Sequence, residues 1–516
     1  MSARPSRTGL ALALIGVATL AAYASSFLVP FQFDDFGRIA NNTPLLRGEW
    51  VAALKWMGNS RLLPSLTLIG DYRLYGTDPP GYHLLNLIVH LLASVGVYAL
   101  ARVIYRRAVP RAAWPAEWEG VFALTASLVF ACHPVQVEAV TYIIQRSAAM
   151  ATMFYVWSVV CFLVARLDAR DGRRGRTGRL YAAAVLLGLC ALLSKENAVT
   201  LPLAWLLAEW CFVGRPPLRT LAAGGIGLLG ACAAVIGLKG IFWGAIGAEL
   251  PSASLFLRNV ITSIASPAGQ VQPLSDVPRY ALTEATVVPR YLLLLVRPWG
   301  MNVDHDVIWQ TQLTGAVAAG TAVIAGLAVA GIVSARRVPP VGFGLWWFLL
   351  TLSVESSLMP LPDAMAERRL YLAMPGVGLV VASAVVAAWQ RLPRLTAVAA
   401  WTALASLTGL TFSRNLVWQS PLSLWRDAAE KSPGKMRPLL NLGVAHHQAG
   451  QLDDAVQAYC AALQLAPDDE VVRDNLETAL DQLGKLVMAG TAVKQNPDGS
   501  VVIELPDVAT FCPAQK

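Results

Sequence analysis

Long apolar runs, separated by short polar and arginine-rich stretches, occupy most of the chain. A helix needs roughly 20 apolar residues to cross the core of a bilayer, so runs of about 17–25 residues are candidate spans. The pattern predicts about eleven spans, near residues 9–30, 82–104, 118–132, 147–166, 180–194, 197–213, 220–246, 311–335, 340–357, 370–389 and 395–413. The pattern therefore predicts an all-α, polytopic membrane domain over residues 1–413.

Basic residues between the apolar runs predict the orientation of the chain. Clusters such as "RVIYRR" and "ARLDARDGRRGRTGR" follow alternate spans, and all of them lie on one side if the N-terminus is cytoplasmic. Cytoplasmic loops carry an excess of Lys and Arg, and an odd number of spans then sends the C-terminal part outward. An alternative is a signal peptide cut after Ala24, which leaves the remaining topology unchanged. The apolar stretch "FLVPFQF" favours an uncleaved anchor.

Composition supports a membrane protein and argues against a nucleic-acid binder. The chain is 55% hydrophobic and 14% charged, with a mean hydropathy of +0.51. Its formal net charge of +8 comes from the arginine clusters, and no basic stripe with interleaved aromatic residues occurs. Most of the seven cysteines lie in or beside apolar runs and have no zinc-site spacing. Cys460 and Cys512 lie in the outward part, where an oxidising compartment would allow a disulfide.

The polar C-terminal part contains a helical repeat. Residues 436–469 carry Leu442-Gly443, Ala455, Tyr459, Ala462 and Pro467 at the offsets of a 34-residue tetratricopeptide unit. We expect a repeat domain over residues 414–485, with one full unit and partial units on either side. The domain is either a structural cap or a groove for a peptide acceptor. In the tail, residues 486–516, "KQNPDGSVVIEL" has the pattern of a hairpin.

Ionisable residues gather in four segments on the predicted outer side. The first loop, residues 31–81, begins with Asp34 and Asp35, and the later segments contain "ACHPVQVEAVTYIIQR", "LSKEN" and "ESSLMPLPDAMAERRLYL". Residues 247–310 hold no full span and include an apolar run with tryptophans that predicts a helix in the outer interface. Charged residues at membrane depth usually face a cavity or a partner. The four segments therefore predict one shared aqueous cavity.

One type of chemistry suits these residues. A carboxylate at the interface can take the proton from an acceptor hydroxyl as the hydroxyl attacks a sugar carbon, and the first candidate for this base is Asp34. Asp35 would orient the acceptor or raise the pKa of the base by like-charge repulsion. A lipid-linked phosphate leaving group needs cationic donors, and the candidates are Arg146, Lys195, Arg368 and Arg369.

Each of these features also has a structural alternative. The acidic pair is compatible with a solvated loop or a helix N-cap. His133, which precedes Pro134, is compatible with a helix cap or bend. Lys195 and Glu196 are compatible with an ordinary interfacial salt bridge.

Several segments together resemble one family. "FDDFGRIANN", "SRLLPSLTLIGDYRLYG", "GYHLLNLIVHLL", "FACHPVQVEAVTYIIQRSAAMAT", "LLSKENAVTLPL" and "AERRLYLAMPGVG" occur in this order before the repeat. The ordered set, over roughly residues 25–470, resembles the transmembrane and tetratricopeptide-repeat-containing proteins. That family comprises GT-C-fold O-mannosyltransferases of the eukaryotic secretory pathway with bacterial relatives.

The resemblance implies a polyprenyl-phosphate-sugar donor, a protein hydroxyl acceptor and reaction on the outer or lumenal side. It also implies a catalytic acidic motif in the first outer loop, which matches Asp34 and Asp35. The family's other recurrent motifs contain His133, Arg146, Lys195, Glu196, Glu367 and Arg368. Two departures stand out: Arg369 occupies a position where an aromatic residue is expected, and only one repeat unit is clear. The arginine-rich composition suggests a bacterial member, with an undecaprenyl-linked donor and a sugar other than mannose as an option.

The predicted function is transfer of a sugar from a polyprenyl-phosphate-linked donor to protein hydroxyl groups at the periplasmic face of a bacterial inner membrane. Asp34 and Asp35 are the predicted catalytic residues, and the residues assigned to the donor phosphate are His133, Arg146, Lys195, Glu196, Glu367, Arg368 and Arg369. No metal-ligating residues and no certain cofactor are predicted; a divalent metal is left open as an option that the residues do not support. The alternatives are transfer to a lipid or glycan, and a non-catalytic scaffold or transporter that uses its repeat domain to bind partners.

Overall fold

The computed structural model describes residues 7–57, 61–109, 114–173, 175–214, 277–358 and 361–490, with the isolated positions 230 and 233. Every regular element in these ranges is a helix, so the all-α prediction is confirmed. The chain divides into two compact units. The first unit comprises Met1–Met301 and Val307–Leu416, and the second comprises Asn302–Asp306 and Val417–Lys516.

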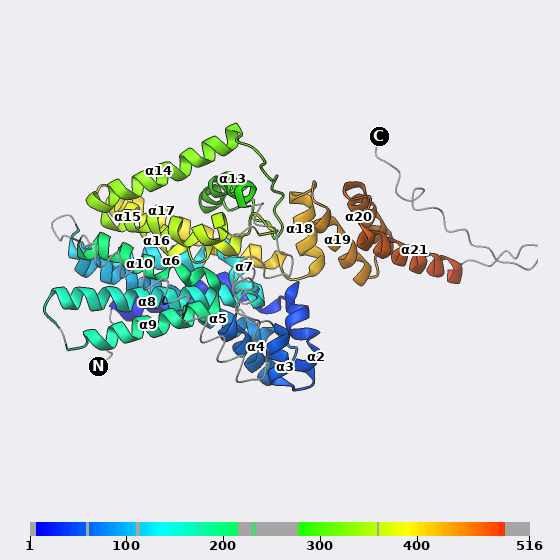
Figure 1. The fold of residues 1–516 in the computed structure, drawn as a ribbon, viewed down its shortest axis with the longest axis horizontal. Helices are drawn as coiled ribbons and strands as arrows, with labels where there is room; N and C mark the ends of the chain where they lie inside the picture. The colour runs from blue at the N-terminus through cyan, green and yellow to red at the C-terminus, as the bar shows by residue number, and fades with distance from the viewer. Residues whose placement is uncertain are drawn as a thin grey trace, which may run out of the picture. The chain divides into compact units, whose positions relative to one another are not determined.

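Helices occupy the positions of ten of the predicted spans (Figure 1). They are α1 (Arg7–Tyr23), α5 (Pro79–Val103), α6 (Glu119–Cys132), α8 (Arg146–Arg170), α9 (Thr177–Ser194), α10 (Leu201–Ala208), α14 (Gly315–Arg337), α15 (Pro339–Ser353), α16 (Met374–Trp389) and α17 (Pro393–Val417). The predicted span over residues 220–246 lies outside the described residues, apart from positions 230 and 233.

Six helical segments of the described chain are long and apolar enough to cross a membrane. A seventh candidate is the pair Ala116–Cys132 and Pro134–Thr141, which bends by 51° at its break. The protein is therefore an integral, multi-pass membrane protein, but the predicted number of eleven spans is not confirmed. Predicted spans that fail this test form shorter helices; α10, for example, continues only as a π-helical turn over Glu209–Val213.

The chain between α6 and α8 is broken into short pieces, including α7 (Val137–Thr141). His133 caps the first piece, because its Nδ1 accepts the N–H of Val135 at 3.2 Å. The Asn86 amide of α5 donates to the carbonyl oxygens of Val140 at 2.9 Å and Ile143 at 3.3 Å. Irregular backbone inside a membrane protein needs such partners, because no bulk water is present to supply them.

Three helices, α2 (Thr43–Leu46), α3 (Trp50–Met57) and α4 (Leu62–Tyr75), form the segment between α1 and α5. This segment is held in place through α4, which packs against α5, α8 and α9.

Arg146, the first residue of α8, joins α4 and α5 to α8. The Arg146 side chain is fully buried, and its Nη2 lies 2.6 Å from Asp71 Oδ2. The same guanidinium donates to Asn86 Oδ1 at 2.5 Å, to the Tyr82 carbonyl oxygen at 3.0 Å and to Thr67 Oγ1 at 3.1 Å. A buried charge is tolerated only when it is paired and hydrogen-bonded, so this network fixes the three helices together.

Helix α13 (Val277–Val296) includes the apolar run that predicted an interfacial helix, but it begins earlier in the sequence. It packs against α14 and buries Tyr280, Glu284 and Tyr291. Residues 247–276 of the predicted interfacial region lie outside the described residues.

The second unit consists of α18 (Pro421–Lys431), α19 (Met436–Gln448), α20 (Leu452–Leu465) and α21 (Glu470–Gly490), each packed on the next. Helices α19 and α20 coincide with the two halves of the 34-residue unit. The close approach of these helices requires glycine, because a Cβ at Gly443 would lie 2.5 Å from the Tyr459 ring. The core around Tyr459 includes Val472 and Leu476 of α21.

Two predictions concern the C-terminal tail. Cys460 forms a disulfide, whereas Cys512, its predicted partner, lies outside the described residues. The predicted hairpin also lies outside them. In the first unit, Cys132, Cys161, Cys190 and Cys211 are free.

The segment Asn302–Asp306 belongs to the second unit, although α13 and α14 on either side of it belong to the first. Asp304 is buried. Its carboxylate pairs with Arg437 Nη2 at 2.6 Å and with Lys435 Nζ, and its carbonyl oxygen accepts the Ser432 hydroxyl at 2.8 Å. This short segment is therefore fixed at the start of α19.

Helices α15 and α16 cross at two glycines, and this crossing gives a test of the fold. A Cβ at Gly344 would lie 2.5 Å from the Gly376 carbonyl oxygen, and a Cβ at Gly376 would meet the Gly344 carbonyl oxygen in turn. We expect Gly376→Ala to lower the free energy of unfolding by about 1–3 kcal/mol, since overpacking forces the helices apart. Gly326→Ala is the control, because nothing lies within 4 Å of its Cβ position. Thermal unfolding in lipid nanodiscs measures both, and equal midpoints would contradict the prediction.

Candidate active site

The two carboxylates of the acidic pair occupy different environments. Asp35 is 1% exposed; its Oδ2 accepts the N–H of Gln32 and its Oδ1 accepts the N–H of Ile144, each at 3.0 Å. Asp34 is exposed, and its backbone N–H donates to the Tyr142 hydroxyl at 3.1 Å. Asp35 therefore anchors this loop to the break before α8, while the Asp34 carboxylate stays accessible to a ligand.

The residue before Asp34 is strained. Phe33 has φ of +46°, and it is the non-glycine residue with positive φ among those described. Its ring packs edge-on against Tyr142, with centroids 5.3 Å apart. Such backbone is costly for a residue with a Cβ, and it persists where surrounding contacts hold it, often at functional sites. Phe33 and Asp35 thus fix Asp34 from both sides.

Arg38 lies in the electrostatic neighbourhood of Asp34, and Arg61 lies in that of Arg38. Burial lowers the pKa of Arg38, and the charge of Arg61 lowers it further, whereas the charge of Asp34 raises it. The Arg38 guanidinium also donates to the Met57 carbonyl oxygen. Because Arg38 follows Asp34 by four residues on a helical turn, the two side chains share one side of that turn.

Arg61 and Glu196 face each other without a hydrogen bond. Arg61 Nε and Glu196 Oε2 are 3.7 Å apart. Arg61 Nε and Glu196 Oε1 are both buried and have no hydrogen-bond partner among the described residues. Buried polar atoms are nearly always paired, and the exceptions need an explanation such as a missing ligand or water. This gap marks a position where a ligand atom could bind.

Two more cations complete the cluster. Lys195 Nζ lies 2.8 Å from Glu355 Oε1, and Arg368 pairs with Glu138 through its guanidinium and donates its backbone N–H to Glu138 Oε2 at 2.8 Å. Burial lowers the pKa of Lys195, and the charges of Arg61 and Arg368 lower it further, although Glu355 opposes them. We call Asp34, Arg38, Arg61, Lys195, Glu196 and Arg368 the Asp34 cluster.

The predicted site residues do not all join this cluster. Lys195, Glu196 and Arg368 do. Arg146 is buried in the network with Asp71 described above. His133 is buried, with Nε2 at 3.1 Å from the Leu295 carbonyl oxygen, as the structural alternative of a helix cap anticipates. Glu367 is buried in a short helix that also contains Arg368 and Arg369.

Arg369 points to a different position from Arg368. Its Nη1 donates to the Ala364 carbonyl oxygen at 2.8 Å and to the Tyr280 hydroxyl at 3.1 Å, and lies 3.4 Å from Glu284 Oε1. Burial raises the pKa of Glu284 to about 7, although Arg369 lowers it. Arg369 stands where the family resemblance expects an aromatic residue, and its acidic partner on α13 explains how this chain accommodates a charge there.

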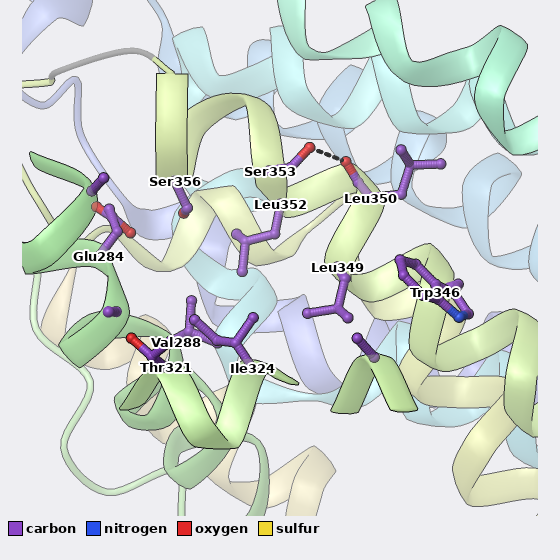
Figure 2. Close-up of a pocket in the computed structure, with 13 residues that line it drawn as sticks. Glu284, Val288, Thr321, Ile324, Trp346, Leu349, Leu350, Leu352, Ser353 and Ser356 are labelled. Atoms are coloured by element: carbon purple, nitrogen blue, oxygen red, sulfur yellow. Dashed lines mark hydrogen bonds between the residues drawn. The ribbon is translucent and has the colours of Figure 1, made fainter. Parts of the chain in front are cut away.

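A largely apolar cavity of about 540 Å³ lies between α13, α14 and α15. Figure 2 shows Glu284 and Ser356 at one end of the cavity and Trp346 at the other. Two contacts lead from this end toward neighbours of the Asp34 cluster. Glu284 lies 3.4 Å from Arg369, which follows Arg368 in sequence, and the Tyr280 hydroxyl donates at 2.5 Å to the carbonyl oxygen of Glu355, the partner of Lys195. The cavity therefore leads from apolar walls toward buried cations.

Sequence reasoning missed several residues of this site. Arg38 carried a readable signal, its position four residues after Asp34. Arg61 and Glu355 lie within two of the polar segments recognised in the sequence, but no role was assigned to them. Tyr142 and Glu284 had no signal, because their partners are far away in sequence. No group of three or more side chains suited to hold a metal ion occurs within the described ranges.

No family model matches the chain, but several curated relatives match most of it. Protein O-mannosyl-transferase F38B6.6 of Caenorhabditis elegans is 24% identical over 87% of this chain and 61% of its own length. Protein O-mannosyl-transferase Tmtc3 of Drosophila melanogaster is 23% identical over 95% of this chain and 59% of its own. Human protein O-mannosyl-transferase TMTC3 is 24% identical over 88% of this chain and 51% of its own. These relatives confirm the resemblance, and the chain spans about half to three-fifths of their length.

One solved structure shows a distant likeness. It is the crystal structure of ArnT from Cupriavidus metallidurans bound to undecaprenyl phosphate, with a TM-score of 0.43 and 14% identity over 98% of this chain and 85% of that one. By its own helices the chain is an all-α, multi-pass membrane protein, and its curated relatives are named protein O-mannosyl-transferases.

The environments of the acidic pair predict opposite effects of removing each carboxylate. Asp35→Ala leaves two buried N–H groups without acceptors, which we expect to lower the free energy of unfolding by about 2–5 kcal/mol. Asp34→Ala removes an exposed side chain and should change it by less than about 0.5 kcal/mol. Thermal unfolding of both variants in nanodiscs tests this difference. A larger loss for Asp34→Ala would reverse the assignment.

Asp35 also predicts a dependence of stability on pH. Burial raises the pKa of Asp35 from 3.8 to about 8, so the folded chain keeps a proton that the unfolded chain releases. The stability from this proton is full below about pH 4 and is lost as the pH rises to about 8. The amide in Asp35→Asn cannot titrate, so its unfolding midpoint should fall less than that of the native chain between about pH 5 and 8. Parallel curves would show that Asp35 does not hold the proton.

Proposed function

We propose that the protein is a membrane glycosyltransferase of the GT-C type that moves a sugar from a polyprenyl-phosphate-linked donor to hydroxyl groups of protein acceptors. One observation carries the proposal: Asp34 is an exposed carboxylate on a backbone held by Phe33 and Asp35, and its charge acts on the neighbouring cation Arg38. The names of the curated relatives support it. We place the reaction at the periplasmic face of a bacterial inner membrane, with the N-terminus cytoplasmic.

The donor has two chemically different parts, and the site offers a matching environment for each. The polyprenyl chain fits the apolar walls between α13, α14 and α15, where its burial is favoured by the hydrophobic effect. The phosphate needs positive charge, and the candidate cations are those of the Asp34 cluster, Arg38, Arg61, Lys195 and Arg368. Arg61 is the first candidate to contact it, because its Nε has no hydrogen-bond partner among the described residues.

In the proposed reaction, an acceptor hydroxyl attacks the anomeric carbon of the donor sugar. The new carbon–oxygen bond forms as the bond to the phosphate oxygen breaks, and the hydroxyl proton passes to the Asp34 carboxylate. General base catalysis requires a carboxylate within hydrogen-bond reach of that proton. The cations stabilise the charge that develops on the leaving phosphate. Asp35 and Phe33 act as positioning residues, because they hold the backbone of Asp34.

The proposal leaves the sugar and the acceptor open, and it assigns acceptor binding to the repeat-containing second unit. Arg146 and His133 keep only indirect roles, since their polar atoms already contact protein groups. Arg369 would act at the cavity's polar end beside Glu284 rather than at the sugar.

Transfer from radiolabelled polyprenyl-phosphate sugars by the purified, bilayer-reconstituted protein tests the function. We expect one donor to label polypeptide, and Asp34→Asn to reduce the rate at least about 100-fold, as loss of a general base does. Asp78→Asn is the matched control, because Asp78 is an exposed carboxylate in the same segment that lies outside the cluster. Its rate should equal that of the native protein.

Each other outcome has a distinct meaning. Full activity of a well-folded Asp34→Asn variant would remove Asp34 as the base. Label that appears only in lipid would replace the protein acceptor with a lipid or glycan. No transfer from any donor, with envelope proteins and lipids supplied, would favour a scaffold or transporter.

A further inference from the structure

Glu196 stands between two residues that are both held by Glu355. Lys195 Nζ lies 2.8 Å from Glu355 Oε1, and the Asn197 side-chain amide donates to Glu355 Oε2 at 3.5 Å. Glu196 and Asn197 begin a short 3₁₀ helix, Glu196–Thr200. Because one turn of such a helix takes three residues, their side chains leave it on different sides. The neighbours therefore fix the backbone of Glu196, and its carboxylate faces Arg61 instead.

Arg38 links Glu196 to Asp34. Burial lowers the pKa of Arg38 and the charge of Arg61 lowers it further, whereas the charges of Asp34 and Glu196 both raise it. Interactions between charges weaken with distance and are screened by water and salt. Both carboxylates therefore lie in the neighbourhood of one guanidinium, and Glu196 belongs to the same site as the proposed base.

The unpaired atoms of Arg61 and Glu196 need opposite kinds of partner. Arg61 Nε is a donor and Glu196 Oε1 is an acceptor, and neither has a hydrogen-bond partner among the described residues. The two side chains approach to 3.7 Å, measured from Arg61 Nε to Glu196 Oε2. A phosphodiester oxygen can accept from Arg61 but has no proton to donate to Glu196. An ammonium group can donate to Glu196 but is repelled by Arg61. A ligand that satisfies both atoms must bring an acceptor and a neutral donor close together.

A sugar linked to phosphate combines these two groups. The phosphate oxygen on the anomeric carbon is an acceptor, and the hydroxyl group on the neighbouring ring carbon, C2, is a neutral donor beside it. In glycoside hydrolysis, hydrogen bonds to the 2-hydroxyl group strengthen in the transition state. A carboxylate is a suitable acceptor for such a bond, because hydrogen bonds to ionised groups are stronger than those between neutral groups.

We propose that Glu196 accepts a hydrogen bond from the 2-hydroxyl group of the donor sugar and thereby selects donors with a free hydroxyl group at C2. Arg61 contacts a phosphate oxygen of the same ligand. The sequence placed Glu196 among the residues for the donor phosphate, but a carboxylate repels a phosphate, and the sugar is the part of the donor that it can bind. The class of ligand rests on the proposed function.

Donor binding without an acceptor tests the inference. The probes are undecaprenyl-phosphate mannose, glucose and galactose, with their 2-deoxy counterparts, and the ratio of lipid-bound to free protein in native mass spectra gives each Kd. For the sugar that binds most tightly, the 2-deoxy lipid should bind the native protein about 10- to 100-fold more weakly, as expected for loss of a hydrogen bond to a charged group. In Glu196→Ala, the two lipids should bind about equally.

Bare undecaprenyl phosphate separates this role from a structural one. It has no hydroxyl group to donate at C2 and it is negatively charged, so it should bind Glu196→Ala at least as tightly as the native protein. Glu196→Gln keeps an acceptor oxygen but loses the charge, and it should retain part of the preference for the 2-hydroxyl group. Glu49→Ala is the matched control, because Glu49 is an exposed carboxylate between α2 and α3. It should bind every lipid like the native protein.

The outcomes distinguish this inference from the proposed function. Equal binding of the 2-deoxy and unmodified lipids by the native protein, or a preference that survives in Glu196→Ala, would overturn the inference alone. If none of the lipids binds, including the bare phosphate, the donor class is wrong and both proposals are overturned. The expected preference, with no transfer to any acceptor, would support the role of Glu196 and count against the proposed reaction.

Discussion

The structure around the candidate site depends on one requirement: backbone that leaves the helical pattern inside the protein must still find hydrogen-bond partners. The chain before α8 is irregular, and the Asp35 carboxylate accepts the N–H of Ile144 there at 3.0 Å. Asn86 and Arg146 serve the same region from α5 and α8. Because Asp35 is occupied by this task, its neighbour Asp34 remains exposed and able to meet a substrate.

The charges of the site follow a second requirement, that buried ions are paired or serve a function. Arg146 illustrates the first case, since its guanidinium contacts Asp71 and three neutral acceptors. Arg61 illustrates the second, since it lies 3.7 Å from Glu196 and its Nε has no hydrogen-bond partner in the described ranges. An arrangement of this kind is stabilised when an anionic ligand enters, so incomplete pairing is a better guide to binding than charge alone.

The positions of the helices were largely predictable, because an apolar run is a local property and each described run forms a helix. The number of spans is not confirmed, because six helical segments of the described chain are long and apolar enough to cross a membrane and most of residues 220–246 lie outside that part of the chain. The acidic pair could be recognised in the sequence, because its two carboxylates are adjacent. The different environments of Asp34 and Asp35 could not be predicted, because Asp35 accepts the N–H of Ile144, which is 109 residues away in sequence. Glu284 was missed for the same reason, since its partner Arg369 is 85 residues away.

The two units suggest a division between chemistry and recognition, and the chain itself connects them. Helix α13 carries Glu284 at the polar end of the cavity, and only a few residues later the segment Asn302–Asp306 is fixed within the second unit through buried Asp304. The chain returns to the first unit for α14, which lines the same cavity. The chain that joins these two walls, α13 and α14, is therefore anchored partway along by the ion pairs of Asp304 with Lys435 and Arg437.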